Sequence, residues 1–245
     1  MGQAMSPLSR RLWAAGIVGG VCAIVVLAVL VLKYGRFDPS PPSLEKNPNP
    51  AIPGELLFVD EDGCVVRALA SGESRSRVDC PGAGIWGVSW IDREKIAIGL
   101  ASAADSGRPT WTEFDLATGS ERDTGIIADY SWGTPRTESP QGEQVVIEED
   151  GEVILVAGVV RTKIASFEVP RHRQPQLVTW SPDGEWMLLT YWVERDEARE
   201  LWILSKDGRT KGTIARLDAF GPVGASWWID GRGYLPAIGG LPAGR

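Results

Sequence analysis

A dipeptide of a hydroxyl residue followed by tryptophan recurs along the chain and constrains its fold more than any other feature. The four copies are Ser89-Trp90, Ser131-Trp132, Thr179-Trp180 and Ser226-Trp227, so successive tryptophans are 42, 48 and 47 residues apart. A period in the forties is typical of a repeat that forms one four-stranded sheet. Because tryptophan buries a large apolar area, we predict that these four tryptophans pack between neighbouring sheets.

The third copy is the most complete repeat. The segment 177–180 leads into the turn Ser181-Pro182-Asp183-Gly184, the apolar strand Trp186–Trp192, the strand Leu201–Leu204 and a second turn at Lys206-Asp207-Gly208. Proline sets φ at the corner of such a turn, aspartate hydrogen-bonds nearby backbone and glycine accepts a positive φ. This pattern resembles the WD40-like repeat of TolB-type β-propellers. The resemblance implies an all-β fold of the β-propeller type. The count of tryptophan strands gives a small propeller of about four blades, whereas propellers of that family usually have more.

The other copies match this pattern less well. In the second copy the turn Ser139-Pro140-Gln141-Gly142 begins seven residues after Trp132, whereas in the third copy the turn begins directly after the tryptophan. Residues 55–69 contain two strands without a tryptophan strand, and residues 225–231 supply one. The ring closes if the last strand completes the first sheet. The alternative is an open, incomplete propeller that a partner completes.

The N-terminal region predicts a membrane anchor. Residues 14–32 contain no charge and no proline, and a helix of that length spans roughly 28 Å, close to a bilayer core. Lys33 and Arg36 follow it in place of a cleavage site. We predict a cytoplasmic tail at 1–13, a transmembrane helix at 14–32, a proline-rich linker at 33–53 and a repeat domain at 54–245.

The orientation of this anchor is set by weaker features. Basic residues flank the helix on both sides, so their count does not decide it. The short tail and the segment 9–13, which faintly resembles a twin-arginine export signal, favour a single-pass protein of the cell membrane with its C-terminal domain outside the cytoplasm. Ala15, Gly19 and Ala23 recur every four positions. They indicate either a helix-mediated dimer or the ordinary composition of membrane helices.

Cysteines and titratable residues give little indication of chemistry. Cys64 and Cys80 are the only pair outside the predicted helix, and they form either a disulfide or two buried thiols. His172 is the only histidine and lies between two arginines, in a predicted loop. No metal-binding or catalytic motif is present, so we expect no enzyme activity, metal or cofactor. The net charge of −7 argues against nucleic acid as a partner.

The remaining tryptophans are candidates for recognition. Trp186, Trp192, Trp202 and Trp228 either belong to the core between sheets or form an exposed binding surface. The function that we predict is a protein-interaction or scaffolding module with a partner in the cell envelope. One alternative is an envelope carbohydrate-binding protein or hydrolase that uses the propeller face. Another is a sensor partner of a membrane signalling protein.

Overall fold

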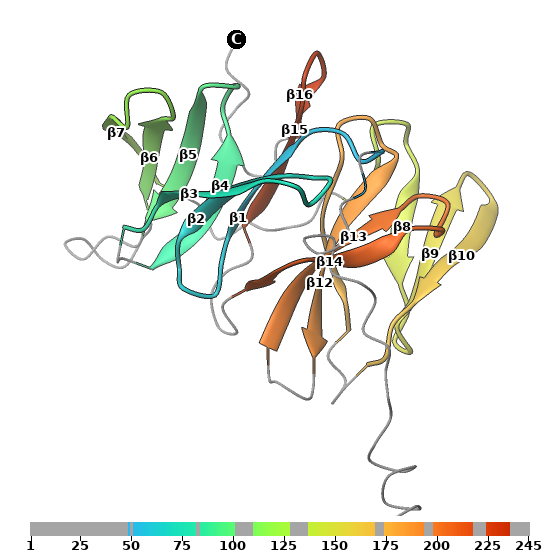
Figure 1. Ribbon diagram of the computed structural model, residues 1–245. Coiled ribbons are helices and arrows are strands. Elements are labelled where there is room, and N and C mark those ends of the chain that lie inside the picture. Colours follow the sequence, from blue (N-terminus) through green and yellow to red (C-terminus); the bar gives the residue numbers. More distant parts are fainter. Residues whose placement is uncertain are drawn as a thin grey trace, which may run out of the picture. The chain divides into compact units, whose positions relative to one another are not determined.

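The computed structural model describes residue 49 and residues 51–81, 84–100, 110–127, 137–169, 174–193, 198–217 and 224–235. All belong to one compact unit, residues 41–245. The regular elements within these ranges are all β-strands (Figure 1), which confirms the all-β prediction. The predicted transmembrane helix at 14–32 lies outside the described residues. Among the residues that are described, no helix is long and apolar enough to cross a bilayer.

The first sheet joins the two ends of the described chain. Its strands, in spatial order, are β16 (Gly233–Tyr234), β15 (Ala225–Ile229), β1 (Glu55–Val59), β2 (Val65–Leu69) and β3 (Arg75–Asp79). Strand β15 pairs antiparallel with β1, and Trp227 lies opposite Leu56. The last tryptophan strand therefore completes the first sheet, which is the pairing that the closed-ring alternative required.

Three further sheets are antiparallel meanders of consecutive strands. The second sheet contains β4 (Ile85–Trp90), β5 (Lys95–Leu100), β6 (Thr110–Asp115) and β7 (Glu121–Ile127). The third contains β8 (Gln144–Ile147), β9 (Glu152–Ala157) and β10 (Val160–Ser166). The fourth contains β11 (Gln176–Trp180), β12 (Trp186–Val193), β13 (Ala198–Ser205) and β14 (Lys211–Leu217).

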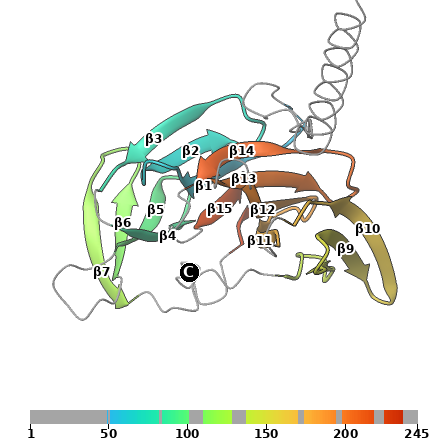
Figure 2. The ribbon, with the colours of Figure 1, turned by 90° about the horizontal axis from the view of Figure 1, so that it is seen from below.

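Three apolar clusters join these sheets face to face. One face of β1 and β2 packs on β4 and β5, and the opposite face packs on β12, β13 and β14. A third cluster joins β8 and β9 to β11, β12 and β13. The order of the sheets is therefore second, first, fourth, third (Figure 2). Within the described ranges no cluster joins the second sheet to the third, so these residues form an open row of four blade-like sheets and not a closed ring.

Repeated tight turns connect the strands. In the turn after β11, the amide of Gly184 donates to the carbonyl of Ser181, and the Ser181 hydroxyl accepts from the amide of Trp186 at 2.9 Å. The turn after β13 repeats this arrangement with Ser205 and Gly208. Both glycines have φ above +70°, a conformation that disfavours other residues. The predicted turn chemistry is thus present in the fourth sheet.

The third sheet places its repeat differently from the sequence prediction. Glu138 bridges Gln144, and the turn at 139–142 follows it directly, as the turn at 181–184 follows Trp180. Glu138 therefore stands at the register position of Trp180. The sequence placed this turn relative to Trp132, whereas in the structure it follows the isolated bridge residue Glu138 directly. Trp132 lies outside the described residues, and its packing stays a prediction.

Candidate interaction surface

The repeat tryptophans that the structure describes are core residues. Trp90, Trp180 and Trp227 are each at most 1% exposed, and each lies in a cluster that joins two sheets. The indole N–H of Trp227 donates to the carbonyl of Pro53 at 3.0 Å, and that of Trp180 donates to the carbonyl of Thr137 at 3.4 Å. These residues hold neighbouring sheets together, in agreement with the sequence prediction.

Trp202 does not belong to an exposed binding surface. It is 5% exposed, and its ring packs edge-on against Phe167 and Tyr191 at centroid distances of 5.4 and 5.7 Å. The cause is register, because Trp202 pairs with Leu189 and both face the third sheet. Its indole N–H donates to the carboxylate of Glu200 at 2.9 Å.

The other three candidates are half-buried and have aromatic, apolar or cationic neighbours. Trp186 packs against the cluster between the first and fourth sheets. The guanidinium of Arg199 lies 5.6 Å from the ring centroid of Trp192. The ring of Trp228 lies 5.9 Å from that of Trp90 and 6.4 Å from that of Tyr234. Together with Trp202, they form parts of separate contacts and not one exposed aromatic patch.

The inner strands of the first and second sheets approach each other closely. A Cβ atom on Gly224 would lie 2.5 Å from the Cα atom of Gly87, a distance that only a glycine allows. The amide of Trp90 donates to the Ser226 hydroxyl at 3.3 Å. Backbone thus fills the space between β4 and the start of β15. The alternative of a ligand bound at the propeller axis gains no support there.

The second sheet has an outward face, turned away from the first sheet, that mixes apolar and charged residues. It contains Lys95, Ala97, Trp111, Glu113 and Arg122, which share one side of β5, β6 and β7. The Glu113 carboxylate pairs with the Lys95 ammonium at 2.9 Å and with the Arg122 guanidinium at 2.5 Å. The hydrogen bond from Lys95 is the main cause that lowers the pKa of Glu113, so this carboxylate is held in its charged form.

The third sheet has a comparable outward face. Val146, Ile154 and Val156 lie on the side of β8 and β9 that is turned away from the fourth sheet, and Arg161 and Lys163 lie opposite Val156 and Ile154. Arg161 pairs with Glu148 at 2.6 Å, and Lys163 pairs with Glu152. Both cations therefore find acidic partners within their own sheet. Sequence reasoning missed these pairs because they join residues on different strands.

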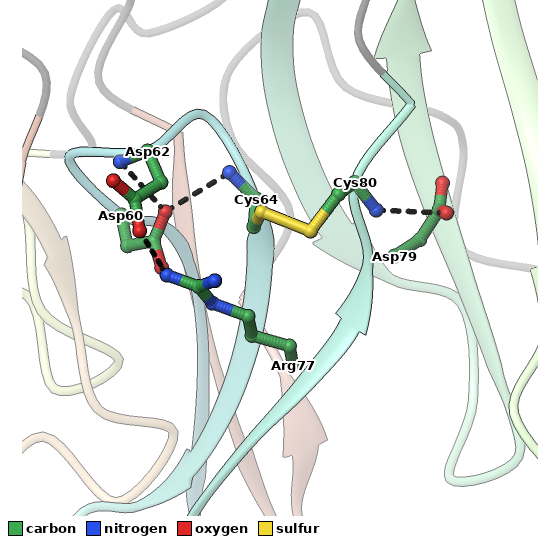
Figure 3. The surroundings of a disulfide bond; sticks show 6 residues. All are labelled: Asp60, Asp62, Cys64, Arg77, Asp79 and Cys80. Carbon is green, nitrogen blue, oxygen red and sulfur yellow. Dashed lines mark hydrogen bonds and ion pairs between the residues drawn. A yellow bond between two sulfur atoms is a disulfide. The ribbon is translucent and has the colours of Figure 1, made fainter.

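A disulfide secures the outermost strand of the first sheet (Figure 3). Cys64, just before β2, is bonded to Cys80, which follows β3, and their Cα atoms are 4.3 Å apart. Beside it, the Asp60 carboxylate accepts hydrogen bonds from the amides of Asp62 and Cys64, both at 3.0 Å, and lies 3.1 Å from the guanidinium of Arg77. Arg77 also pairs with Asp62, and that hydrogen bond is the main cause that raises its pKa.

This arrangement is structural, because each oxygen of Asp60 already has a partner. In the part of the chain that the structure describes, no group of three or more potential ligands could hold a metal ion. His172 lies outside that part. The expectation of no catalytic or metal site therefore stays a prediction.

The chain matches no protein-family model and no curated protein sequence. Among solved structures it is similar to TolB from Acinetobacter baumannii (16% identity, 77% of this chain and 50% of that chain, TM-score 0.26). It is also similar to a putative TolB from Agrobacterium tumefaciens (16%, 79% and 77%, 0.27). A third is the β-propeller domain of the trilobed protease from Pyrococcus furiosus, which has an open velcro topology (19%, 55% and 42%, 0.23).

These neighbours include TolB-type and other β-propeller proteins, but at TM-scores that carry no argument about fold or function. This chain spans half the length of the Acinetobacter protein. The strand order, the pairing of β15 with β1 and the clusters between sheets are those of four blade-like sheets packed in a row.

Proposed function

We propose that this chain is a membrane-anchored protein-interaction module whose sheets lie outside the cytoplasm. The observation that carries the proposal is the open row of sheets. The second and third sheets stand at its two ends, and neither outward face packs on another sheet within the described residues. Ala97, Trp111 and Ile154 on these faces are already buried within the chain, and a partner protein is the class of molecule that can cover the exposed residues around them.

The chemistry of the outward faces supports an interaction surface. Apolar side chains such as Val146 and Val156 are flanked by ion pairs, and Arg122 and Lys163 are exposed. A specific protein interface commonly combines an apolar centre with a polar, wet rim.

Two features support the location of the domain. The Cys64–Cys80 bond is typical of oxidising compartments, since cytosolic thiols are kept reduced. The apolar segment at 14–32 has the length and composition of a single-pass anchor. The proline-rich linker at 33–53 would then hold the sheets away from the bilayer as a semi-rigid spacer.

Site-specific photocrosslinking in intact cells tests the proposal. A photoreactive residue replaces Arg122 on the second sheet or Lys163 on the third, and Ser76, which is exposed on β3, serves as the control. We expect positions 122 and 163 to crosslink to the same protein and position 76 to give no such product. Equal capture at all three positions, or none at 122 and 163, would contradict the proposed surface.

A further inference from the structure

The turn between β9 and β10 contains two exposed valine side chains. Val159 is 99% exposed and Val160 is 59% exposed, and Gly158 before them has a φ of 59°. Exposed large apolar residues are few in the described chain, and none other approaches the exposure of Val159. Ala157 on the other side of the glycine is exposed too. The tip of this hairpin is therefore apolar over four consecutive residues, 157–160.

Eight other turns in the described ranges contain a glycine with positive φ, and their composition differs. The residue before that glycine is polar in each of them: Asp62, Ser71, Thr118, Gln141, Asp150, Asp183, Asp207 and Asp230. Polar residues are typical of such turns because they hydrogen-bond the local backbone and remain hydrated. The β9–β10 turn has no polar residue beside its glycine. Ordinary turn chemistry does not explain Val159 and Val160.

The chain enters the first sheet on the same side as this turn. The amide of Asn49 donates to the carbonyl of Ser71 in the β2–β3 turn at 2.9 Å, which fixes the entry of the chain beside the start of β1. Figure 1 shows the start of β1 and the β9–β10 turn toward the upper side of the sheets, whereas the β1–β2 turn is on the lower side. The segment that leads from the proposed anchor thus joins the sheets on the side where the apolar tip lies.

We propose that the β9–β10 tip inserts Val159 and Val160 into the surface of the bilayer that anchors the chain. The inference rests on the membrane anchor of the proposed function. Two valines give only weak membrane binding in a free protein, since affinity grows with the apolar area removed from water. An anchored chain binds more strongly through the same two valines. Its helix already holds it at the membrane, so the valines meet the bilayer at a high local concentration. The 16 residues at 33–48, before the chain meets the first sheet at Asn49, reach roughly 50 Å when extended as polyproline II.

The charges near the tip define which lipid chemistry the contact uses. Arg161 and Lys163 already pair with Glu148 and Glu152, so they are not available in full to anionic headgroups. The contact is therefore apolar, and we expect it to depend little on the fraction of anionic lipid. A protein pocket that accepts the two valines is the competing occupant.

The test uses the full chain in liposomes. A Val159→Cys variant carries an environment-sensitive fluorophore in a Cys22→Ala background, in which Cys64 and Cys80 remain bonded to each other. The liposomes contain phosphatidylcholine and lipids with a quencher on the acyl chain. Glu61→Cys is the matched control, because Glu61 is exposed in the β1–β2 turn on the opposite side. We expect a blue shift and at least a twofold stronger quenching at position 159 than at position 61, unchanged when phosphatidylglycerol is added.

The outcomes separate this inference from the proposed function. Flotation of the chain with the liposomes but equal quenching at positions 159 and 61 would overturn the tip contact and leave the anchor in place. A blue shift at position 159 without lipid quenching would assign the tip to a protein contact and overturn the inference as well. Failure of the chain to float would overturn the anchor and, with it, the insertion of the tip.

Discussion

The first and third sheets differ in the side chains of their strands, because the first lies between two sheets and the third lies at the end of the row. The first sheet lies between two others, and Leu56, Leu57 and Phe58 in its strand β1 are all fully buried although they alternate between two faces. The third sheet packs on the fourth with one face, and within the described ranges no cluster joins its opposite face to another sheet. There Val153 is fully buried, whereas Lys163, on the strand beside it, is half exposed and paired with Glu152. A strand between two sheets therefore carries a continuous apolar run, whereas at the end of the row a strand such as β10 carries charged residues on its outward side.

The largest expected effect belongs to an interface between two sheets. Trp227→Ala should lower the free energy of unfolding by about 3–5 kcal/mol, because it leaves a cavity and removes the hydrogen bond to Pro53. Lys163→Ala on the outward face of the third sheet is the matched comparison and should change it by no more than about 0.5 kcal/mol. Urea denaturation in detergent, followed by near-ultraviolet circular dichroism, measures both. An equal loss of unfolding free energy in both variants would contradict the difference between covered and outward faces.

The second-largest effect concerns the disulfide that secures the outer strand β3. Replacing Cys64 and Cys80 by serine should destabilise the protein by roughly 3 kcal/mol, since the bond closes a loop across a sequence separation of 16. Strand β10 has no such bond in the described residues, so a reducing agent should loosen β3 selectively. Hydrogen exchange followed by mass spectrometry would show this as faster exchange over 75–79 and unchanged exchange over 160–166. A uniform increase would argue that the bond supports the whole fold.

A smaller effect distinguishes the turns of the fourth and third sheets. Ser181→Ala removes a fully buried hydroxyl that accepts from the amide of Trp186, and should cost about 1 kcal/mol. Ser139→Ala removes the hydroxyl at the matching place in the third sheet, where it accepts from Gln141 and Glu143 at 3.2 and 3.1 Å. Because those hydrogen bonds are longer, we expect Ser139→Ala to lower the free energy of unfolding by less than Ser181→Ala does. Thermal unfolding of the two variants side by side gives the order, and a reversed order would contradict it.

The smallest effect is the pH dependence of an outward ion pair. The pKa of Glu113 is lowered in the folded protein, so its contribution to stability is complete above the pKa of the unfolded state, about 4.3, and is lost as the pH falls through the folded value. Glu113→Gln should therefore flatten the stability profile below pH 5 and change little near neutrality. Unfolding midpoints between pH 3 and 7 measure this. A variant that parallels the parent profile would show that Glu113 does not contribute.

Local patterns in the sequence predicted much of this fold. The turn at 181–184 and the strands on either side of it follow from short segments, and the pairing of the last tryptophan strand with the first sheet was one of two alternatives. The candidate surface was harder to predict. Trp202 alternates correctly for a strand, but the sequence does not reveal that its side faces the third sheet.

The amino-acid sequence by itself determined that the chain after its linker would be all-β and that tryptophans would fill the spaces between sheets. These features depend on side-chain alternation, turn residues and apolar area, which are local properties. Only the tertiary structure decided that Glu138 takes the register position of Trp180 in the third sheet and that Glu113 meets both Lys95 and Arg122. It also decided that, within the described residues, no apolar cluster joins the second sheet to the third. Register between strands and contact between sheets join residues far apart in the chain, and no short segment contains that information.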